Sequence, residues 1–305
     1  LDKTDAVQSK ARKKSVPLGC PSNVDGYLWA RCYLHNREAQ SGRVIVLNPR
    51  QTKKPAVPYV YQGENAIMWD VRNHVIRVND ETVGIDLSDV SDIEQKAKRL
   101  IRTHCGKIRV VVWAEQSKLA SSLIQALAQC SAPRMSLNVQ WYKGSGRDLD
   151  QLAPLASKLF HLSLQGWKLT HRQLKPLLRL SNLSSLNLNG TKITDGGLET
   201  LSRIAKLRAL GLLGAKLTDA GLQHLCRLSH LTYLDLSNTQ VSDAGIRHLS
   251  RLSGLTSLNL SNTQVTDAGI RHLSRLSGLT SLDLYQTKVT DIGVKYISRI
   301  SSLKT

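Results

Sequence analysis

The chain has 305 residues and a formal net charge of +19, from 42 lysines and arginines against 23 aspartates and glutamates. Hydrophobic residues make up 41% of the sequence, enough for two domains of ordinary size, but no run of about 18 apolar residues occurs, so the sequence predicts no transmembrane helix. The positive charge would attract polyanions such as nucleic acid, acidic lipid headgroups or acidic polymers, and it equally suits a protein that only needs to stay in solution.

The first 19 residues predict a flexible basic linker, because they are polar and include the run SKARKKS. The stretch lacks the apolar core of a signal peptide, and the chain begins with Leu1 rather than methionine. A targeting segment that had already been removed would leave the same start, so the compartment stays open between the cell envelope and the cytoplasm. Cys20 and Cys32 follow, either as a disulfide or as two free thiols.

Residues 20–148 are predicted to form a small α+β domain. Alternating and branched apolar runs favour strands, and two stretches with apolar residues at helical spacing favour helices. The predicted order is strands at 66–71, 74–79 and 83–88, a helix at 89–104, a strand at 107–116, a helix at 117–130 and a strand at 134–142.

Two stretches of this region, HVIRVNDETVGIDL and VVVWAEQSKLASSLIQAL, are similar to the small periplasmic domain of ExbD/TolR-type biopolymer-transport proteins. The resemblance implies the α+β outline of that domain. Two departures stand against it. Glu115 occupies the place where the family often has aspartate, and the transmembrane helix that usually precedes the domain is missing.

From residue 149 to residue 305 the sequence is organised in units of 24 residues. The stretch DAGIRHLSRLSGLTSL occurs at 243–258 and again, unchanged, at 267–282. A fixed period of about 20–29 residues with this leucine pattern predicts a stack of six leucine-rich repeats. The L-x-x-L-x-L pattern starts at Leu159, Leu183, Leu207, Leu231, Leu255 and Leu279.

Each part of the unit has a predicted role. Alternation along a short strand predicts that Leu234 and Leu236 point inward, while Tyr233, Asp235 and Ser237 point to solvent. A serine or threonine eleven positions after each start is predicted to cap a helix, and the aspartate that follows it in five repeats suits the positive end of the helix dipole. The first repeat instead reads THRQ at 170–173, a capping box.

Residues 159–302 resemble bacterial leucine-rich repeats of the LxxLxLxxTxVTDAGLxxLxxLxx kind, similar in outline to the ribonuclease-inhibitor-like group. The resemblance implies an α/β solenoid with parallel strands on the concave side and helices on the convex side, which binds macromolecules and catalyses nothing. Threonine replaces the family's asparagine in four repeats. Trp167 and Ala215 stand at that place in the first and third repeats, which predicts looser or differently packed turns there.

The concave face is where members of this family usually bind. Small polar residues dominate its outward positions, so the aromatic residues are the main candidate anchors. The candidate binding residues are His161, Leu213, Tyr233, Asp235, Asp283 and Tyr285.

A second candidate surface consists of one arginine per repeat, twenty positions after each start. Either each guanidinium satisfies the last carbonyls of its helix, or together the six form an anion-binding ridge. The six are Arg179, Arg203, Arg227, Arg251, Arg275 and Arg299. His224, His248 and His272 also share one register, but no cysteine or carboxylate accompanies them, so no metal site is predicted.

No catalytic motif is recognisable: the sequence contains no G-x-S-x-G, P-loop, H-E-x-x-H or C-x-x-C, and its five cysteines have no metal-ligand spacing. No cofactor or enzymatic activity is predicted. The preferred function is a protein-interaction scaffold whose repeats bind a protein partner. The alternatives are a binder of nucleic acid or another acidic polymer and, third, an enzyme with its site in the N-terminal region.

The end of the array is predicted to be uncapped. Leu303 stands where a seventh repeat would begin, and no capping segment follows it. An exposed apolar end usually needs cover. We expect fraying of the last repeat in a monomer, with end-to-end self-association as the alternative.

Overall fold

A computed structural model of the chain describes residues 67–70, 75–78, 81–86, 93–104, 110–113, 121–131, 134–139 and 146–303. The predicted linker over residues 1–19, the pair Cys20 and Cys32, and Glu115 lie outside the described residues. None of the helices that the structure describes is both long enough and apolar enough to cross a membrane.

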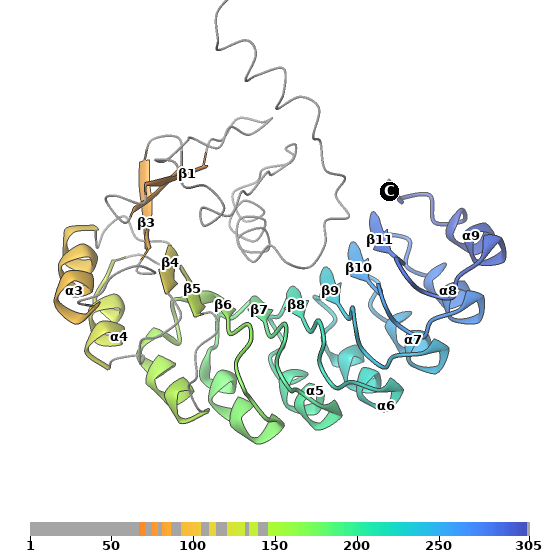
Figure 1. Cartoon of the computed structure of the whole chain (residues 1–305), viewed down its shortest axis with the longest axis horizontal. Helices are drawn as coiled ribbons and strands as arrows, with labels where there is room; N and C mark the ends of the chain where they lie inside the picture. The colour runs from red at the N-terminus through yellow and green to blue at the C-terminus, as the bar shows by residue number, and fades with distance from the viewer. Residues whose placement is uncertain are drawn as a thin grey trace, which may run out of the picture.

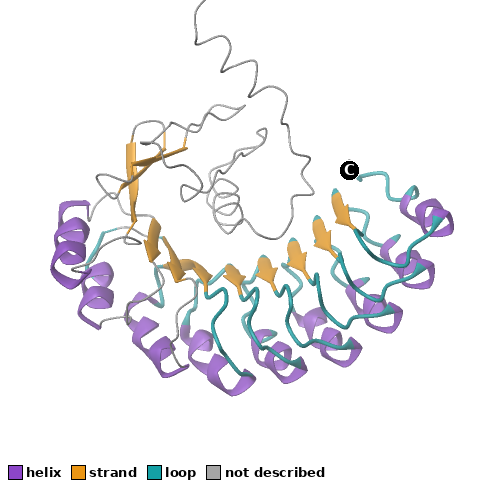
Figure 2. Ribbon diagram, in the orientation of Figure 1, coloured by secondary structure: helices purple, strands orange, loops and turns teal. Residues whose placement is uncertain are grey.

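The described elements form an arc in which the strands line the inner edge and the helices lie along the outer edge (Figure 1). Figure 2 shows the same division by secondary structure, and between residues 159 and 303 a loop joins each strand to the helix that follows it. Within the described residues the strands make one eleven-stranded sheet whose order is the order of the chain. Because consecutive units stack side by side, every unit contacts only its neighbours.

The N-terminal part of the sheet contains the strands and helices that the sequence predicts between residues 66 and 142. β1 pairs with β2, and β2 with β3, in antiparallel orientation, and all later pairs are parallel. The elements are β1 (Ile67–Asp70), β2 (Val75–Val78), β3 (Glu81–Asp86), α3 (Ile93–His104), β4 (Val110–Trp113), α4 (Ser121–Ala128) and β5 (Met135–Val139).

The sheet runs on across residue 148, where the sequence suggests a domain boundary. β5 pairs in parallel with β6 (Leu159–Ser163), with Leu137 opposite Leu162, and the 3-10 helix η2 (Gly146–Leu155) lies between them in the chain. The division into domains at 20–148 and 149–305 therefore stays a prediction, drawn within a continuous sheet.

Seven consecutive parallel strands, β5 to β11, alternate with helices, and the six that belong to the repeats begin near the predicted leucines. The prediction of six parallel repeat strands is confirmed. After β6 the elements are η3 (His171–Arg179), β7 (Ser185–Asn187), α5 (Asp195–Leu201), β8 (Ala209–Gly211), α6 (Asp219–Leu222), η4 (Gln223–Arg227), β9 (Tyr233–Asp235), α7 (Asp243–Leu249), β10 (Ser257–Asn259), α8 (Asp267–Leu273), β11 (Ser281–Asp283) and α9 (Asp291–Ile297).

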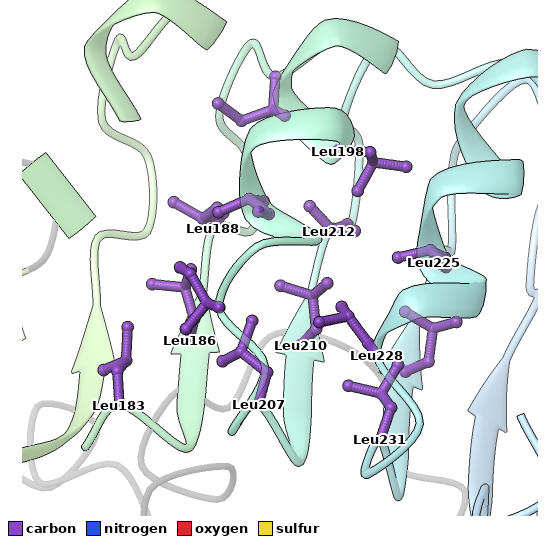
Figure 3. Close-up of a cluster of buried hydrophobic side chains, with 14 of the residues drawn as sticks. Leu183, Leu186, Leu188, Leu198, Leu207, Leu210, Leu212, Leu225, Leu228 and Leu231 are labelled. Atoms are coloured by element: carbon purple, nitrogen blue, oxygen red, sulfur yellow. The ribbon is translucent and has the colours of Figure 1, made fainter. Parts of the chain in front are cut away.

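The core is a stack of leucines between the sheet and the helices. Equivalent residues of neighbouring repeats are partners across the sheet, as Leu258 is with Leu234 on one side and Leu282 on the other. Figure 3 shows the leucines of one repeat lying beside those of the next. A single repeat has only one strand and one short helix, so its apolar side chains become buried only between two neighbours.

The turn after each strand is built the same way in all six repeats. The residue seven positions after each start has a positive φ: it is glycine in the first three repeats and Asn238, Asn262 and Gln286 in the others. Threonine at the next position bonds its own turn, as Thr191 Oγ1 does to the carbonyl of Leu188 at 2.6 Å.

The turns at Trp167 and Ala215 are packed differently and are not looser in their backbone hydrogen bonds. The backbone N–H of Trp167 donates to the carbonyl of Leu164 at 3.1 Å, and that of Ala215 to Leu212 at 3.0 Å. Both side chains are buried. Backbone bonding and burial thus hold these turns without the threonine hydroxyl.

Aspartate and the hydroxyl residue do not mainly serve their own helix, as the sequence suggested, but join consecutive repeats. Asp243 Oδ1 accepts the backbone N–H of Thr266 in the next repeat at 2.8 Å, and Oδ2 accepts the Thr266 hydroxyl at 2.6 Å. We call this contact the Asp clamp. It recurs between Asp195 and Thr218, Asp219 and Ser242, and Asp267 and Thr290.

The predicted helix caps are correspondingly incomplete. The hydroxyls of Thr194, Thr218 and Ser242 accept no capping bond, whereas those of Thr266 and Thr290 each accept a backbone N–H two residues on. A hydroxyl can donate its proton to the neighbouring carboxylate and still accept a capping N–H, as those of Thr266 and Thr290 do. The first repeat keeps the predicted capping box, in which Gln173 Oε1 accepts the N–H of Thr170 at 2.9 Å.

The Asp clamp explains the glycine three residues after the hydroxyl. A Cβ on Gly269 would lie 2.4 Å from Asp243 Oδ1. We expect Gly269→Ala to lower the free energy of unfolding by about 1–3 kcal/mol through this overpacking, although alanine normally favours a helix. Gly254→Ala is the matched control, because its Cβ would meet nothing nearer than 3.5 Å. Equal stability of the two variants in urea unfolding would contradict this account.

Candidate functional site

The concave surface divides into a buried part and an accessible part, whereas the sequence predicts that all of its outward residues reach solvent. His161 on β6 is only 1% exposed, and Asp235 on β9 is 2% exposed. Leu213, Tyr233 and Asp283 are half-buried. Alternation along a strand assigns a face to each side chain but does not account for crowding on the inside of a curved sheet, where small polar side chains are shielded by their neighbours.

His161 belongs to the buried part. Its Nδ1 lies 2.8 Å from Ser185 Oγ, while its Nε2 and the nearby Ser163 Oγ are buried without a hydrogen-bond partner. Burial lowers the pKa of His161 to about 4, so the imidazole is neutral at pH 7. This residue is therefore not placed to meet a partner that approaches from solvent.

The two candidate aspartates have a structural task in common. Asp235 Oδ1 accepts the backbone N–H of Ser237 at 3.0 Å, and Asp283 Oδ1 accepts that of Tyr285 at 2.9 Å. Burial raises the pKa of the Asp235 carboxyl, and the bonds from Ser237 oppose this shift. Asn187 and Asn259 make the same contact in other repeats, so a side-chain oxygen two residues upstream is a feature of the turn.

The accessible part extends from the third to the sixth repeat. Tyr285, which follows β11, is 68% exposed and is the most exposed large hydrophobic residue that the structure describes. Asp283 stands two residues before it, Leu213 belongs to the third repeat and Tyr233 to the fourth. Of the six predicted concave residues, the structure leaves these four within reach of solvent.

All six ridge arginines are exposed at the end of the helical segment of their repeat. The prediction that they satisfy the last helix carbonyls finds no support, because the preceding serine does so. Ser250 Oγ donates to the carbonyl of Arg247 at 2.7 Å, and Ser274 Oγ to that of Arg271 at 2.8 Å. The sequence signal for this role is the serine just before the arginine in the second, fourth, fifth and sixth repeats.

In the described part of the chain, few acidic side chains neutralise the positive charge of the ridge arginines. Within the part of the chain that the structure describes, only Arg179 of the six forms an ion pair, with Asp150 at 3.3 Å between Nη1 and Oδ1. Arg299 stacks on the ring of Tyr296. Four of the aspartates in the repeats are occupied by Asp clamps, so their carboxylates face a neighbouring repeat instead of the arginines.

His224, His248 and His272, which share one register next to the ridge, have no further metal-ligating side chains gathered around them in the described part of the chain. Among the described residues no three histidine, cysteine, aspartate or glutamate side chains gather where they could hold a metal ion. Partial burial lowers the pKa of His248, and the positive charges of Arg247 and Arg251 lower it further. The surroundings of this histidine therefore favour anions over cations.

Comparison with known families agrees with the repeat geometry. Residues 229–272 match the family of leucine-rich repeats in two copies, and residues 179–202 match a single leucine-rich repeat. The chain therefore contains leucine-rich repeats. Neither range reaches residues 20–148, so the resemblance of that region to the ExbD/TolR-type domain stays a prediction. No curated protein matches the chain.

Two solved structures are similar to part of this chain. An internalin C2 from Listeria monocytogenes is 22% identical, with a TM-score of 0.46, over 61% of this chain and 83% of the internalin. An internalin (inlF) from the same organism is 21% identical, with a TM-score of 0.38, over 71% of this chain and 76% of the other.

Proposed function

We propose that the leucine-rich repeats form a non-catalytic module that binds a protein partner through the accessible part of the concave surface. The observation that carries this proposal is the exposure of Tyr285 at the end of β11. Large aromatic side chains are enriched among the residues that dominate binding energy at protein interfaces. Asp283, Tyr233 and Leu213 extend the same surface toward the middle of the array.

The fold suits this role because parallel strands present a continuous inner surface whose spacing is fixed by the repeat. The buried part, which extends from His161 on β6 to Asp235 on β9, contributes rigidity, since its polar side chains bond one another or their own turns. Because this surface is already ordered before binding, a partner would bind it with little loss of conformational entropy on this side of the interface.

The test of this proposal uses the full chain with a photo-crosslinking amino acid in place of Tyr285, and in place of Lys295 on α9 as a control position. A protein crosslinked only from position 285 is then purified and its affinity measured. We expect Tyr285→Ala to weaken binding at least tenfold, which is a loss of about 1.4 kcal/mol or more, and Lys295→Ala to have little effect. Equal affinities of the two variants would reject the concave surface as the binding site.

A second candidate function is binding of a polyanion along the ridge. It is favoured by the exposed guanidiniums of Arg203, Arg227, Arg251 and Arg275, which have no ion-pair partner in the described part of the chain. Successive parallel strands lie about 4.8 Å apart, and the outer helices splay further, so the charges form a row that solvent and salt only partly screen.

Salt dependence separates the two candidate functions. With a duplex DNA oligonucleotide as probe, we expect the slope of log affinity against log salt to be about −0.9 for each phosphate contact. Changing the four unpaired arginines to glutamine should reduce that slope by roughly three to four, whereas changing them to lysine should preserve it. A slope that does not respond to the glutamine variant would exclude the ridge.

A further inference from the structure

Four of the five interfaces between consecutive repeats have the same three parts, and the interface between the first two repeats lacks the Asp clamp because His171 stands at the aspartate position. Consecutive strands pair through their backbones, leucine and branched residues pack together, and an Asp clamp joins one repeat to the hydroxyl residue of the next, as between Asp267 and Thr290. The two bonds from Thr290 lower the pKa of Asp267, which keeps the carboxylate ionised. The clamp is directional: the aspartate of a repeat bonds the repeat that follows it, and the serine or threonine bonds the repeat that precedes it.

The sixth repeat contains an aspartate at the position that forms the clamp in the repeats before it. Asp291 follows Thr290 just as Asp267 follows Thr266, and it is exposed. No described residue donates a hydrogen bond to its carboxylate, in contrast to the four aspartates before it.

The apolar part of the interface is also present and uncovered. Val294 is 55% exposed, whereas Ile270, at the same position of the fifth repeat, is 1% exposed. Ile297 is half-buried where its counterpart Leu273 is fully buried. Leu282, Leu284 and Val289 differ from their counterparts in the same way.

Backbone donors complete the pattern. In the fifth repeat the N–H groups of Leu260 and Asn262 donate to the carbonyls of Asp283 and Tyr285, each at 2.8–2.9 Å. The equivalent donors of the sixth repeat are the N–H groups of Leu284 and Gln286, and neither N–H donates a hydrogen bond to another described residue. The outer face of the sixth repeat is therefore the same interface with one side missing.

We propose that this face binds a further repeat-type segment, and that Asp291 is the group that recognises it. The segment would supply a short parallel strand, a serine or threonine whose hydroxyl and backbone N–H reach Asp291, and a glycine three residues later. The glycine is required because a Cβ on Gly293 would lie 2.4 Å from Asp267 Oδ1, and the same clash would arise against Asp291. This face adjoins the concave surface of the proposed function at Tyr285, and its recognition group, Asp291, lies outside that surface.

A second copy of the chain fits this face poorly. Two copies joined end to end about a two-fold axis would bring together two Asp291 carboxylates, both acceptors, with no donor between them. A copy joined through the opposite end of its sheet would offer β1, and residues 71–81 that follow it contain no serine or threonine. Neither arrangement completes the clamp.

The test supplies the missing unit as a peptide with the sequence of residues 255–278, which contains Thr266 and Gly269. It is added free to the full chain and, in a second form, fused to the C-terminus through a Gly/Ser linker, which raises its effective concentration to the millimolar range. In the unfused chain we expect amides of residues 289–303 to exchange faster than the matching amides of 241–255. Fusion should slow the exchange of residues 289–303 at least tenfold.

Three variants make the test specific. Thr266→Val in the peptide and Asp291→Asn in the chain should each weaken binding by about tenfold or more, because each removes a charge-assisted hydrogen bond. Lys295→Ala in the chain should not. Unchanged exchange after fusion of the intact peptide, or equal binding by the Thr266→Val peptide, would overturn the proposal. So would dimerisation of the chain alone that Asp291→Asn leaves intact, since the occupant would then be a second copy.

Discussion

Replacing Leu258 with alanine lowers the free energy of unfolding by about 2–5 kcal/mol, as expected for a fully buried leucine in a packed core. Leu258 is 1% exposed and lies between Leu234 and Leu282 in the sheet, with identical sequence around it in the neighbouring repeat. Removal of its side chain leaves a cavity that the stacked repeats on either side cannot close. Urea unfolding of the full chain, followed by circular dichroism, measures the loss.

Leu282→Ala is the matched control, because Leu282 occupies the same position one repeat later but is half-buried. We expect it to cost less than half as much. A loss below about 0.5 kcal/mol for Leu258→Ala would mean that this leucine is not in the core and that the repeat register is wrong.

Acidification destabilises the array through His161, by about 3 kcal/mol between pH 7 and pH 4. Burial lowers the pKa of this imidazole from 6.5 to about 4. Because the unfolded chain takes up the proton more readily, the stabilisation is complete above pH 6.5 and is lost as the pH falls toward 4, at about 1.4 kcal/mol for each pH unit. Nε2 has no hydrogen-bond partner, so a proton there would place an unpaired charge in the interior.

The measurement is the free energy of unfolding at several pH values between 7 and 4 for the unaltered chain and for His161→Gln. Other groups titrate in the same range, so the informative quantity is the difference between the two slopes, which we expect to be about 1.4 kcal/mol per pH unit. His230→Gln, at an exposed position, should leave the slope unchanged. Parallel curves for the unaltered chain and His161→Gln would show that His161 is accessible to protons in the folded state.

The repeat strands were predictable because the leucine period directly records which side chains must be buried. Leu234 and Leu236 are inward, as alternation predicts, and both are fully buried. The burial of Asp235 was not predictable in the same way, since it depends on how closely the side chains of adjacent strands approach on the inside of the arc. The same holds for His161 and Ser185, which are 24 residues apart and bond only because the repeats stack.

The Asp clamp was missed because the sequence suggested local partners for each residue of the Thr-Asp-x-Gly motif. A hydroxyl residue before a helix suggests a cap, and an aspartate after it suggests the helix dipole, whereas the carboxylate of Asp243 bonds Thr266, 23 residues away. A partial signal is the glycine three residues after the hydroxyl residue. It recurs in five repeats, and in the last four of them a Cβ would meet the aspartate of the preceding repeat, whereas at Gly197 it would meet Ile193. The continuity of the sheet across residue 148 had no such signal, because residues 107–142 lack the 24-residue period.

The directional Asp clamp also determines how the array can change in length during evolution. Deletion of residues 243–266 would join Ser242 to Asp267, so that Asp219 would still bond Ser242 and Asp267 would still bond Thr290. Loss or gain of one whole unit therefore leaves no unmatched carboxylate, while any other length change shifts the aspartate away from its hydroxyl partner. The identical stretches at 243–258 and 267–282 are the mark that such a duplication would leave, and the fold accommodates it without a compensating substitution.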